Sequence, residues 1–334
     1  MKTNDFSYFI HKYLVDYLPK ECGASENTID TYRYNFIQFF YFLDSKEIKP
    51  EKIAIKDINR TLVTEYLNWL ESEKNNSVST RNCRLAVFCS FCRFLKYEYP
   101  DYIDQYIDIL NIPIKKDIKE NVGYLEIDGI KLLMKQPNRN IKKGNRDYLI
   151  LLIMYESAMR VSEIINIKIN DLHRVKPYYI KVIGKGKKTR NVPLPEKVME
   201  EINEYIKTDN IKTKPADHLL FFNPRGESFT RAGICYILKK YCDMARNKNE
   251  NLIPKKVTPH VIRHSKAMHL LQNGVNLVYI RDILGHTSIQ TTEIYARADS
   301  KHRQEALSKA YQDIYPNEKA EWEDKSILDW LKRF

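Results

Sequence analysis

Apolar residues recur with a helical period through the first third of the chain, and this pattern restricts the fold more than any other feature. Segment 25–43 shows it in six residues at three- and four-residue steps: Ile29, Tyr32, Phe36, Phe39, Phe40 and Leu43. This spacing predicts an amphipathic helix, and Asn27 is placed to cap its start. Two more amphipathic helices are predicted over Thr61–Leu70 and Thr80–Tyr97. The first third is therefore expected to be a small helical bundle that closes near Asp104.

A polar, charged segment separates this bundle from the rest of the chain. Leu110–Leu125 is interrupted by Pro113 and Gly123, as expected of an interdomain linker. A chain of 334 residues is also long enough for two domains, each with its own core. We therefore expect a helical domain over 1–109, a linker over 110–122, a second domain over 123–300 and a C-terminal tail over 301–334.

The second domain has a mixed pattern. Helices are predicted around Leu149–Ile165 and again from Arg231 onward. Between them, apolar residues alternate over 180–182, a turn bounded by glycines follows, and the alternation resumes over 192–194. This arrangement is typical of a β-hairpin. The predicted fold class is mainly α, with a small β-hairpin or sheet.

The charge balance indicates a polyanionic partner. Lys and Arg number 55 against 43 Asp and Glu, which gives a net charge of +12 and favours nucleic acid or an anionic membrane surface. The longest strongly apolar run, Tyr148–Tyr155, is far shorter than the roughly 20 residues that a spanning helix needs. The start of the chain has no signal-peptide core. We therefore expect a cytoplasmic protein with no membrane partner. In such a reducing compartment Cys89 and Cys92, inside a predicted helix, are expected to be core thiols.

Two short motifs suggest a nucleotide or a metal, and both fail on inspection. Lys185 lies between Gly184 and Gly186, but the pattern of a phosphate-cradling loop is incomplete around it. His260 and His264 have the spacing of a zinc-binding helix. The residue after the first histidine is valine where a metalloprotease needs glutamate, and Arg263 would repel a cation. We therefore expect no metal and no cofactor.

Four motifs in order resemble the catalytic domain of the tyrosine recombinase, or phage integrase, family. "SAMRVSE" is similar to a family segment of the "TGLR" type and contains Arg160 and Glu163. A "GKG" hairpin, "HVIRH" over 260–264, and "LGH" followed nine residues later by Tyr295 complete the set. The resemblance extends from about Gly123 to Ala298, and the first third is similar to the family's helical, SAM-like core-binding domain. It implies two domains that close round duplex DNA as a C-shaped clamp.

The resemblance also implies a role for each motif residue. Arg160 and Arg263 would hold the scissile phosphate, where attack on phosphorus adds negative charge, and guanidinium geometry suits that task. The further roles implied are His286 as another donor, Tyr295 as nucleophile, His260 as proton acceptor or relay, Lys185 as general acid and Glu163 as an orienting residue. His264 is expected to pack. The product would be a 3′-phosphotyrosyl link and a free 5′ hydroxyl.

Several other cations are candidates for binding the duplex. They are Lys187, Lys188, Lys255, Lys256 and Lys266, together with Arg81 and Arg84, which form either a groove-facing edge or a solvated helix start. Lysines would contact phosphates and make binding sensitive to salt. The resemblance further implies that a C-terminal segment, here the apolar tail, joins protomers into a homo-tetramer on two DNA sites; the alternative is that the tail docks on its own domain. Off DNA, a monomer or dimer is possible.

The sequence favours a site-specific recombinase that acts in integration, transposition or dimer resolution. Two alternatives share the fold: a type IB topoisomerase-like enzyme that relaxes DNA, and a non-catalytic DNA-binding regulator. The apolar tail and the "LGH" motif favour recombination over relaxation. A regulator would have no need of Tyr295. Whether that tyrosine serves its own protomer or a neighbour stays open.

Overall fold

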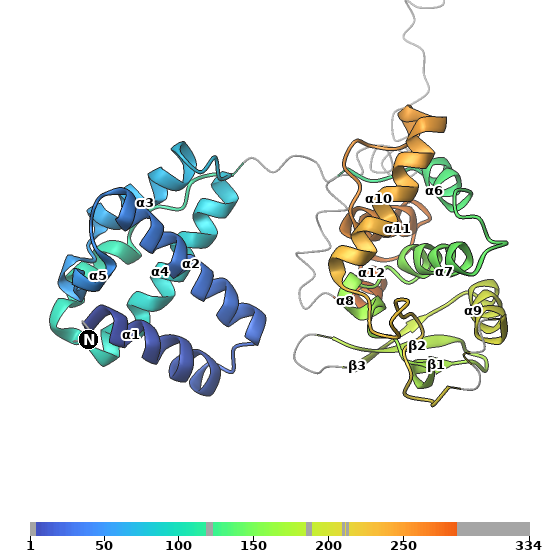
Figure 1. The fold of residues 1–334 in the computed structure, drawn as a ribbon, viewed down its shortest axis with the longest axis horizontal. Coiled ribbons are helices and arrows are strands. Elements are labelled where there is room, and N and C mark those ends of the chain that lie inside the picture. Colours follow the sequence, from blue (N-terminus) through green and yellow to red (C-terminus); the bar gives the residue numbers. More distant parts are fainter. Residues whose placement is uncertain (1–4, 118–122, 185–188, 209–210, 212–213, 286–334) are drawn as a thin grey trace, which may run out of the picture. The chain divides into compact units, whose positions relative to one another are not determined.

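The computed structural model describes residues 5–117, 123–184, 189–208, 211 and 214–285. The chain divides into two compact units, Met1–Glu120 and Asn121–Phe334 (Figure 1). Within the described ranges, helices dominate both units, and the second also contains a three-stranded sheet. The predicted fold class is confirmed. Among the described residues, none of the helices is both long and apolar enough to cross a membrane.

The first unit is a helical bundle. Its helices are α1 (Asp5–Lys12), the π-helical segment η1 (Tyr13–Glu21), α2 (Glu26–Ser45), α3 (Arg60–Ser72), α4 (Val78–Glu98) and α5 (Ile103–Leu110). The helices predicted over Thr61–Leu70 and Thr80–Tyr97 are confirmed as α3 and α4. The cap predicted for α2 is wrong: Ser25 has the extended backbone of an N-cap, while Asn27 already lies in the first turn.

Aromatic side chains fill the core of this bundle. Phe39 is fully buried, and its ring meets those of Phe6, Tyr66 and Phe88 edge to face at centroid distances of 6.1, 5.3 and 5.0 Å. Such contacts add to the free energy gained by burying the rings. The core thiols are present as expected, since Cys92 is buried and Cys89 packs partly buried against the same cluster.

The chain stays attached to the first unit beyond α5. Ile112 is buried in the bundle core. The Arg81 guanidinium donates to the Pro113 carbonyl at 3.1 Å, and the side chain of Asn82 bonds both the N–H and the carbonyl of Lys115. Residues 112–115, which the sequence assigns to the linker, therefore pack on the helical unit.

The second unit is built around a buried helix, α7 (Lys142–Glu156). Its elements are α6 (Ile127–Met134), α7 (Lys142–Glu156), α8 (Val161–Ile164), β1 (Leu172–His173), β2 (Tyr179–Ile183), β3 (Thr189–Pro193), α9 (Glu196–Thr208), α10 (Arg231–Lys248), α11 (Pro259–Gln272) and α12 (Leu277–Leu284). The buried helix α7 packs between α9 and α11. The hairpin is confirmed, with Ile180 opposite Val192 and Val182 opposite Arg190. Strand β1, which the sequence did not predict, extends it into a sheet.

The helices predicted around Leu149–Ile165 are confirmed as α7 and α8. The segment Leu149–Ile165 breaks after Glu156, and α8 begins only at Val161. Ala158 lies in the break with φ of 48°, a left-handed backbone that cannot continue a right-handed helix. The apolar period continues across the break, which is why the sequence alone did not reveal it. This break produces the corner from which Arg160 projects.

The aromatic core makes a testable prediction about stability. Phe39→Ala removes a fully buried ring and should lower the free energy of unfolding of the first unit by about 3–5 kcal/mol. Tyr41→Ala on the same helix, where the side chain is 58% exposed, should change it by less than about 0.5 kcal/mol. Urea titration of the full chain, followed by circular dichroism, measures both. Equal effects of the two substitutions would contradict this account of the core.

Candidate active site

The predicted catalytic residues fall into two groups. Arg160, Glu163, His260 and Arg263 lie within the described residues. The remaining predicted positions lie outside them: Lys185, Lys187, Lys188, His286, Tyr295 and the tail 301–334. The described residues therefore contain the cationic part of the site and the helix that ends just before His286.

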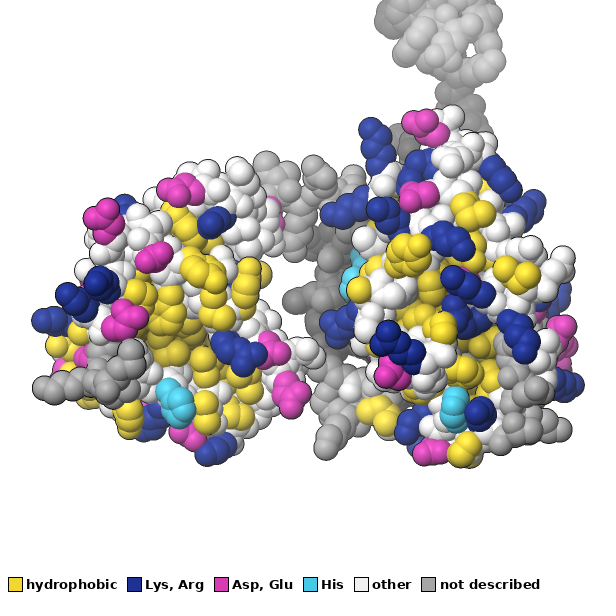
Figure 2. Space-filling view, in the orientation of Figure 1, with side chains coloured by type: hydrophobic (Ala, Val, Ile, Leu, Met, Phe, Trp, Pro, Cys, Tyr) yellow, Lys and Arg dark blue, Asp and Glu magenta, His cyan; other side chains and the backbone are white. Residues whose placement is uncertain are grey.

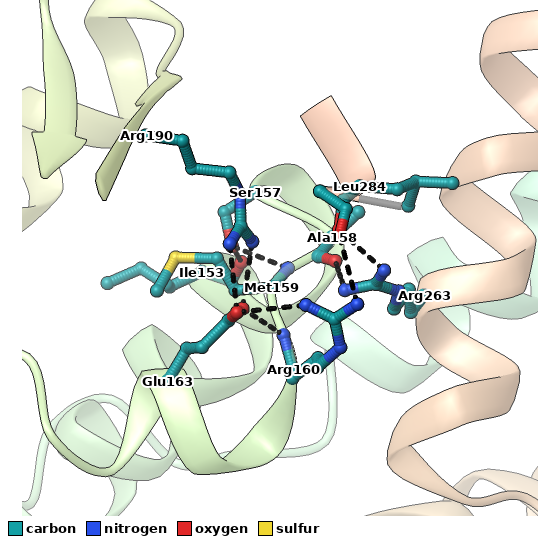
Figure 3. Close-up of polar contacts among 10 residues, drawn as sticks. Ile153, Ser157, Ala158, Met159, Arg160, Glu163, Arg190, Arg263 and Leu284 are labelled. Atoms are coloured by element: carbon teal, nitrogen blue, oxygen red, sulfur yellow. Dashed lines mark hydrogen bonds and ion pairs between the residues drawn. The ribbon is translucent and has the colours of Figure 1, made fainter. Parts of the chain in front are cut away.

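Arg160 occupies the corner between α7 and α8 (Figure 3). Its backbone N–H donates to Glu163 Oε2 at 2.7 Å, which caps the start of α8 as in a capping box. Its Nη1 donates to Glu163 Oε1 at 3.1 Å, and its Nη2 donates to the Gly285 carbonyl at 3.0 Å. The side chain is still 35% exposed, so one part of the guanidinium is held while another faces solvent.

Arg263 approaches the same place from α11. Thr258 caps this helix by accepting the N–H of Val261, and Arg263 follows in the second turn, buried to 3% exposure. Its Nη1 donates to the Ala158 carbonyl at 3.0 Å and its Nη2 to the Leu284 carbonyl at 2.6 Å. The structure thus brings the two predicted clamp arginines to neighbouring carbonyls at the end of α12.

Gly285 ends α12 in the left-handed conformation, with φ of 63°, as is common for a glycine at a helix C-cap. Its carbonyl accepts from Arg160, and that of the preceding Leu284 accepts from Arg263. The chain then leads directly to His286, the next predicted donor. Both arginines are therefore held by carbonyls at the end of α12.

A third arginine completes the cluster, and sequence reasoning missed it. Arg190 on β3 donates from Nη1 and Nη2 to the two oxygens of Glu163, each at 2.9 Å. Burial alone would raise the pKa of the Glu163 carboxyl, but the hydrogen bonds from Arg190 and from the Arg160 backbone, with the charges of both arginines, hold it below its ordinary value. Alternation along β3 was the available signal, because it puts Arg190 on the same face as buried Val192.

The two histidines of the opening turns of α11 share a cationic environment. Partial desolvation and the positive charges of Arg263, Arg160 and Arg231 lower the pKa of His260, which is itself exposed at the surface. Desolvation and the neighbouring His260 and Arg263 lower the pKa of His264 to about 4. Both rings are therefore neutral at pH 7. Across the part of the chain that the structure describes, no group of three potential metal-ligating side chains is present.

The structure revises the predicted DNA-binding cations. Lys255 and Lys256 are exposed just before α11, as a phosphate contact requires. Lys266 is paired with Glu156 at 2.7 Å and lies over the Tyr155 ring, so it is engaged within the protein. Other Lys and Arg side chains are spread over the visible face of the second unit in Figure 2.

The structure separates the two arginines predicted on the first unit to form a groove-facing edge. Arg81 is buried to 3% exposure, with its guanidinium bound to Asn82 and to the Pro113 carbonyl, so its predicted groove-facing role is wrong. Arg84 stacks over the Tyr34 ring at 4.8 Å and is half-buried. The helical period could not show this, because the chain that covers Arg81 comes from beyond α5.

His264 makes stability depend on pH. Its pKa is lowered from the ordinary value of 6.5 to about 4 in the folded protein, so the unfolded chain binds the proton first as the pH falls. The stabilising contribution is complete above pH 6.5 and is lost as the pH falls toward 4. Between pH 7 and pH 5, the free energy of unfolding of the wild type should fall about 1 kcal/mol more than that of His264→Gln, allowing for partial exposure of the ring. Urea titrations at both pH values measure this, and identical pH dependence would contradict it.

Comparison with known proteins gives these residues a context. The family model "Phage integrase family" matches residues 124–302, and the model "Phage integrase, N-terminal SAM-like domain" matches residues 10–99. The chain is 31% identical to the tyrosine recombinase XerD of Staphylococcus epidermidis over 92% of this chain and 98% of the relative.

Two solved structures share the fold. One is the XerH site-specific recombinase bound to a palindromic difH substrate, with a TM-score of 0.66, 23% identity, and 86% of this chain and 80% of that chain covered. The other is the Tn1549 transposon integrase in complex with transposon right end DNA. Its TM-score is 0.69 and its identity 17%, and the match covers 90% of this chain and 98% of that chain. The two family models, the full-length likeness to a curated relative and the order of the motifs agree, and the chain belongs to the phage integrase family of tyrosine recombinases.

Proposed function

We propose that this chain is a site-specific DNA recombinase that cuts and rejoins strands through a 3′-phosphotyrosine on Tyr295. The observation that supports the site most directly is the meeting of Arg160 and Arg263 at the end of α12, next in sequence to His286. Two guanidiniums in fixed positions suit a phosphodiester whose charge grows during attack. The full-length likeness to recombinases disfavours the topoisomerase-like and regulatory alternatives.

In the reaction proposed for this site, the bond that forms replaces the bond that breaks, and the proton that is lost is matched by one that is returned. The phenolic oxygen of Tyr295 attacks phosphorus, an oxygen–phosphorus bond to the enzyme forms, and the bond to the 5′ oxygen breaks. A phenol with a pKa of about 10 must lose its proton as it attacks, and the neutral imidazole of His260 can accept it. Lys185 would return a proton to the departing 5′ oxygen. Attack by a 5′ hydroxyl of another strand reverses these steps and rejoins the DNA.

Both units would contribute to duplex binding in the cytoplasm. We assign residues 1–109 to a core-binding domain and 123–300 to a catalytic domain, joined by the linker 110–122. In the catalytic domain, exposed cations flank the site: Lys255 and Lys256 before α11, and Arg231 at the first turn of α10. The positive charge of Arg231 also contributes to lowering the pKa of His260. Such contacts to phosphates make affinity fall steeply with salt.

The assignment of the nucleophile is tested with Tyr295→Phe. Selection from random duplexes first recovers a bound sequence, and a nicked duplex with that sequence traps the covalent intermediate. The variant should bind the duplex as the wild type does but form no protein–DNA adduct on a denaturing gel, because a benzene ring offers no oxygen to phosphorus. Tyr279→Phe, a matched change at a 66% exposed tyrosine on α12, should form adducts normally. Adducts from Tyr295→Phe at the wild-type level would disprove the assignment.

Assembly is tested by shortening the tail. We propose that residues 321–334, with apolar Ile327, Leu328, Trp330 and Leu331, join protomers in a homo-tetramer on two DNA sites. Deleting these residues should abolish the tetramer while leaving the affinity for one site within about threefold, because the cationic surfaces of both units remain. Light scattering of the complexes, with gel-shift titration on a single-site duplex, measures both properties. A tetramer of unchanged stability would rule the proposal out.

A further inference from the structure

Among the described residues of the site, Arg190 and Glu163 form the ion pair with the best-matched geometry. Its two terminal nitrogens face the two oxygens of Glu163, and both side chains are largely buried, with 17% and 6% exposure (Figure 3). A bidentate pair of this kind fixes direction as well as distance. Arg190 also comes from β3, a different part of the unit from the corner that holds Glu163.

Glu163 is shared between two guanidiniums. Each of its oxygens accepts one bond from Arg190 and one from Arg160. The two arginines and one carboxylate sum to a charge of +1, whereas Arg160 and Glu163 alone would sum to zero. Without Arg190, the remaining contacts would leave Arg160 as the charged partner of Glu163, and the full carboxylate charge would act on that one guanidinium. Arg160 would then meet a phosphate as half of a neutral pair.

Close packing holds Arg190 in this position. Its guanidinium lies flat against Gly285, so closely that a Cβ at that glycine would come within 2.8 Å of Cζ and Nε. The carbonyl of the same glycine accepts from Arg160. Strand β3, the corner at Arg160 and the end of α12 therefore meet at one carboxylate and one glycine.

We propose that Arg190 is a positioning residue for strand cleavage: by occupying Glu163, it leaves the guanidinium of Arg160 directed and charged for the scissile phosphate. This inference rests on the proposed function, since it assigns to Arg190 a part in the same reaction. It predicts a loss of rate at phosphorus and no loss of duplex affinity.

The test uses the full-length chain and the nicked duplex recovered by selection. One version carries an ordinary scissile phosphate, and in the other a methyl group replaces one non-bridging oxygen, which removes the negative charge that the arginines neutralise. On the ordinary phosphate, Arg190→Gln should form adducts about 10- to 100-fold more slowly than the wild type at saturating DNA, since part of the stabilisation of the transition-state charge is lost. On the methylphosphonate, the difference should shrink to within about threefold, as it also should for Arg160→Gln.

Two control variants separate positioning from folding. Arg139→Gln removes an arginine that also pairs with a glutamate and stacks on a tyrosine. Its partners, Glu201 on α9 and Tyr148 on α7, are not part of the cluster, so this variant should match the wild type on both duplexes. Arg190→Lys keeps the charge without the paired geometry and should recover only part of the rate. Thermal melting shows whether each variant folds.

The outcomes are distinct. A wild type that forms no adduct on the selected duplex overturns both the proposed function and this inference. A wild type that reacts while Arg190→Gln reacts equally fast overturns the inference alone. An equal defect of Arg190→Gln on both phosphates also overturns it, because the lost contribution would then not act through charge at phosphorus.

Discussion

Three guanidinium groups gather in one place before any phosphate binds, and their mutual repulsion must be offset by oxygen atoms of the protein itself. One carboxylate, Glu163, serves two of them. The remaining acceptors are main-chain carbonyls of Ala158, Leu284 and Gly285. These carbonyls lie at or just beyond the C-terminal ends of α7 and α12, where such groups have no partner within the helix and carry partial negative charge. The ends of two helices thus hold the cations without neutralising them.

An unusual backbone conformation is required to turn those carbonyls toward the site. Gly285 adopts the left-handed conformation at little cost, but Ala158 adopts it with a side chain, at a cost of about 1 kcal/mol. The family's "TGLR"-like segment has glycine at this position, so the chain departs from the pattern where strain matters. Ala158 is fully buried in a small cluster with residues of α11 and α12, and this packing stabilises the corner. The strained backbone at Ala158 therefore lies next to the helices whose residues form the site.

Much of this architecture could be predicted from the sequence, because it depends on local patterns. The helical period gave α3 and α4, and alternation gave the hairpin. The break after Glu156 could not be seen, since apolar residues continue across it. Arg190 was missed because it belongs to a run of cations with the composition of a solvated turn, although alternation with Val192 puts it on the inner face of the strand. Arg81 was misjudged for the opposite reason, because a distant segment covers it.

The exposures of the arginines indicate how the roles of the predicted clamp divide. The Arg160 side chain, which is 35% exposed, is the more accessible to solvent and hence to a phosphate. Arg263, at 3%, bridges the carbonyls of Ala158 and Leu284 and so connects the α7 corner to the end of α12. A lysine has a single nitrogen and could not span both acceptors with the same rigidity. In the buried position, screening by water is weak, so the charge of Arg263 contributes to the field at the site while its guanidinium also joins two helices.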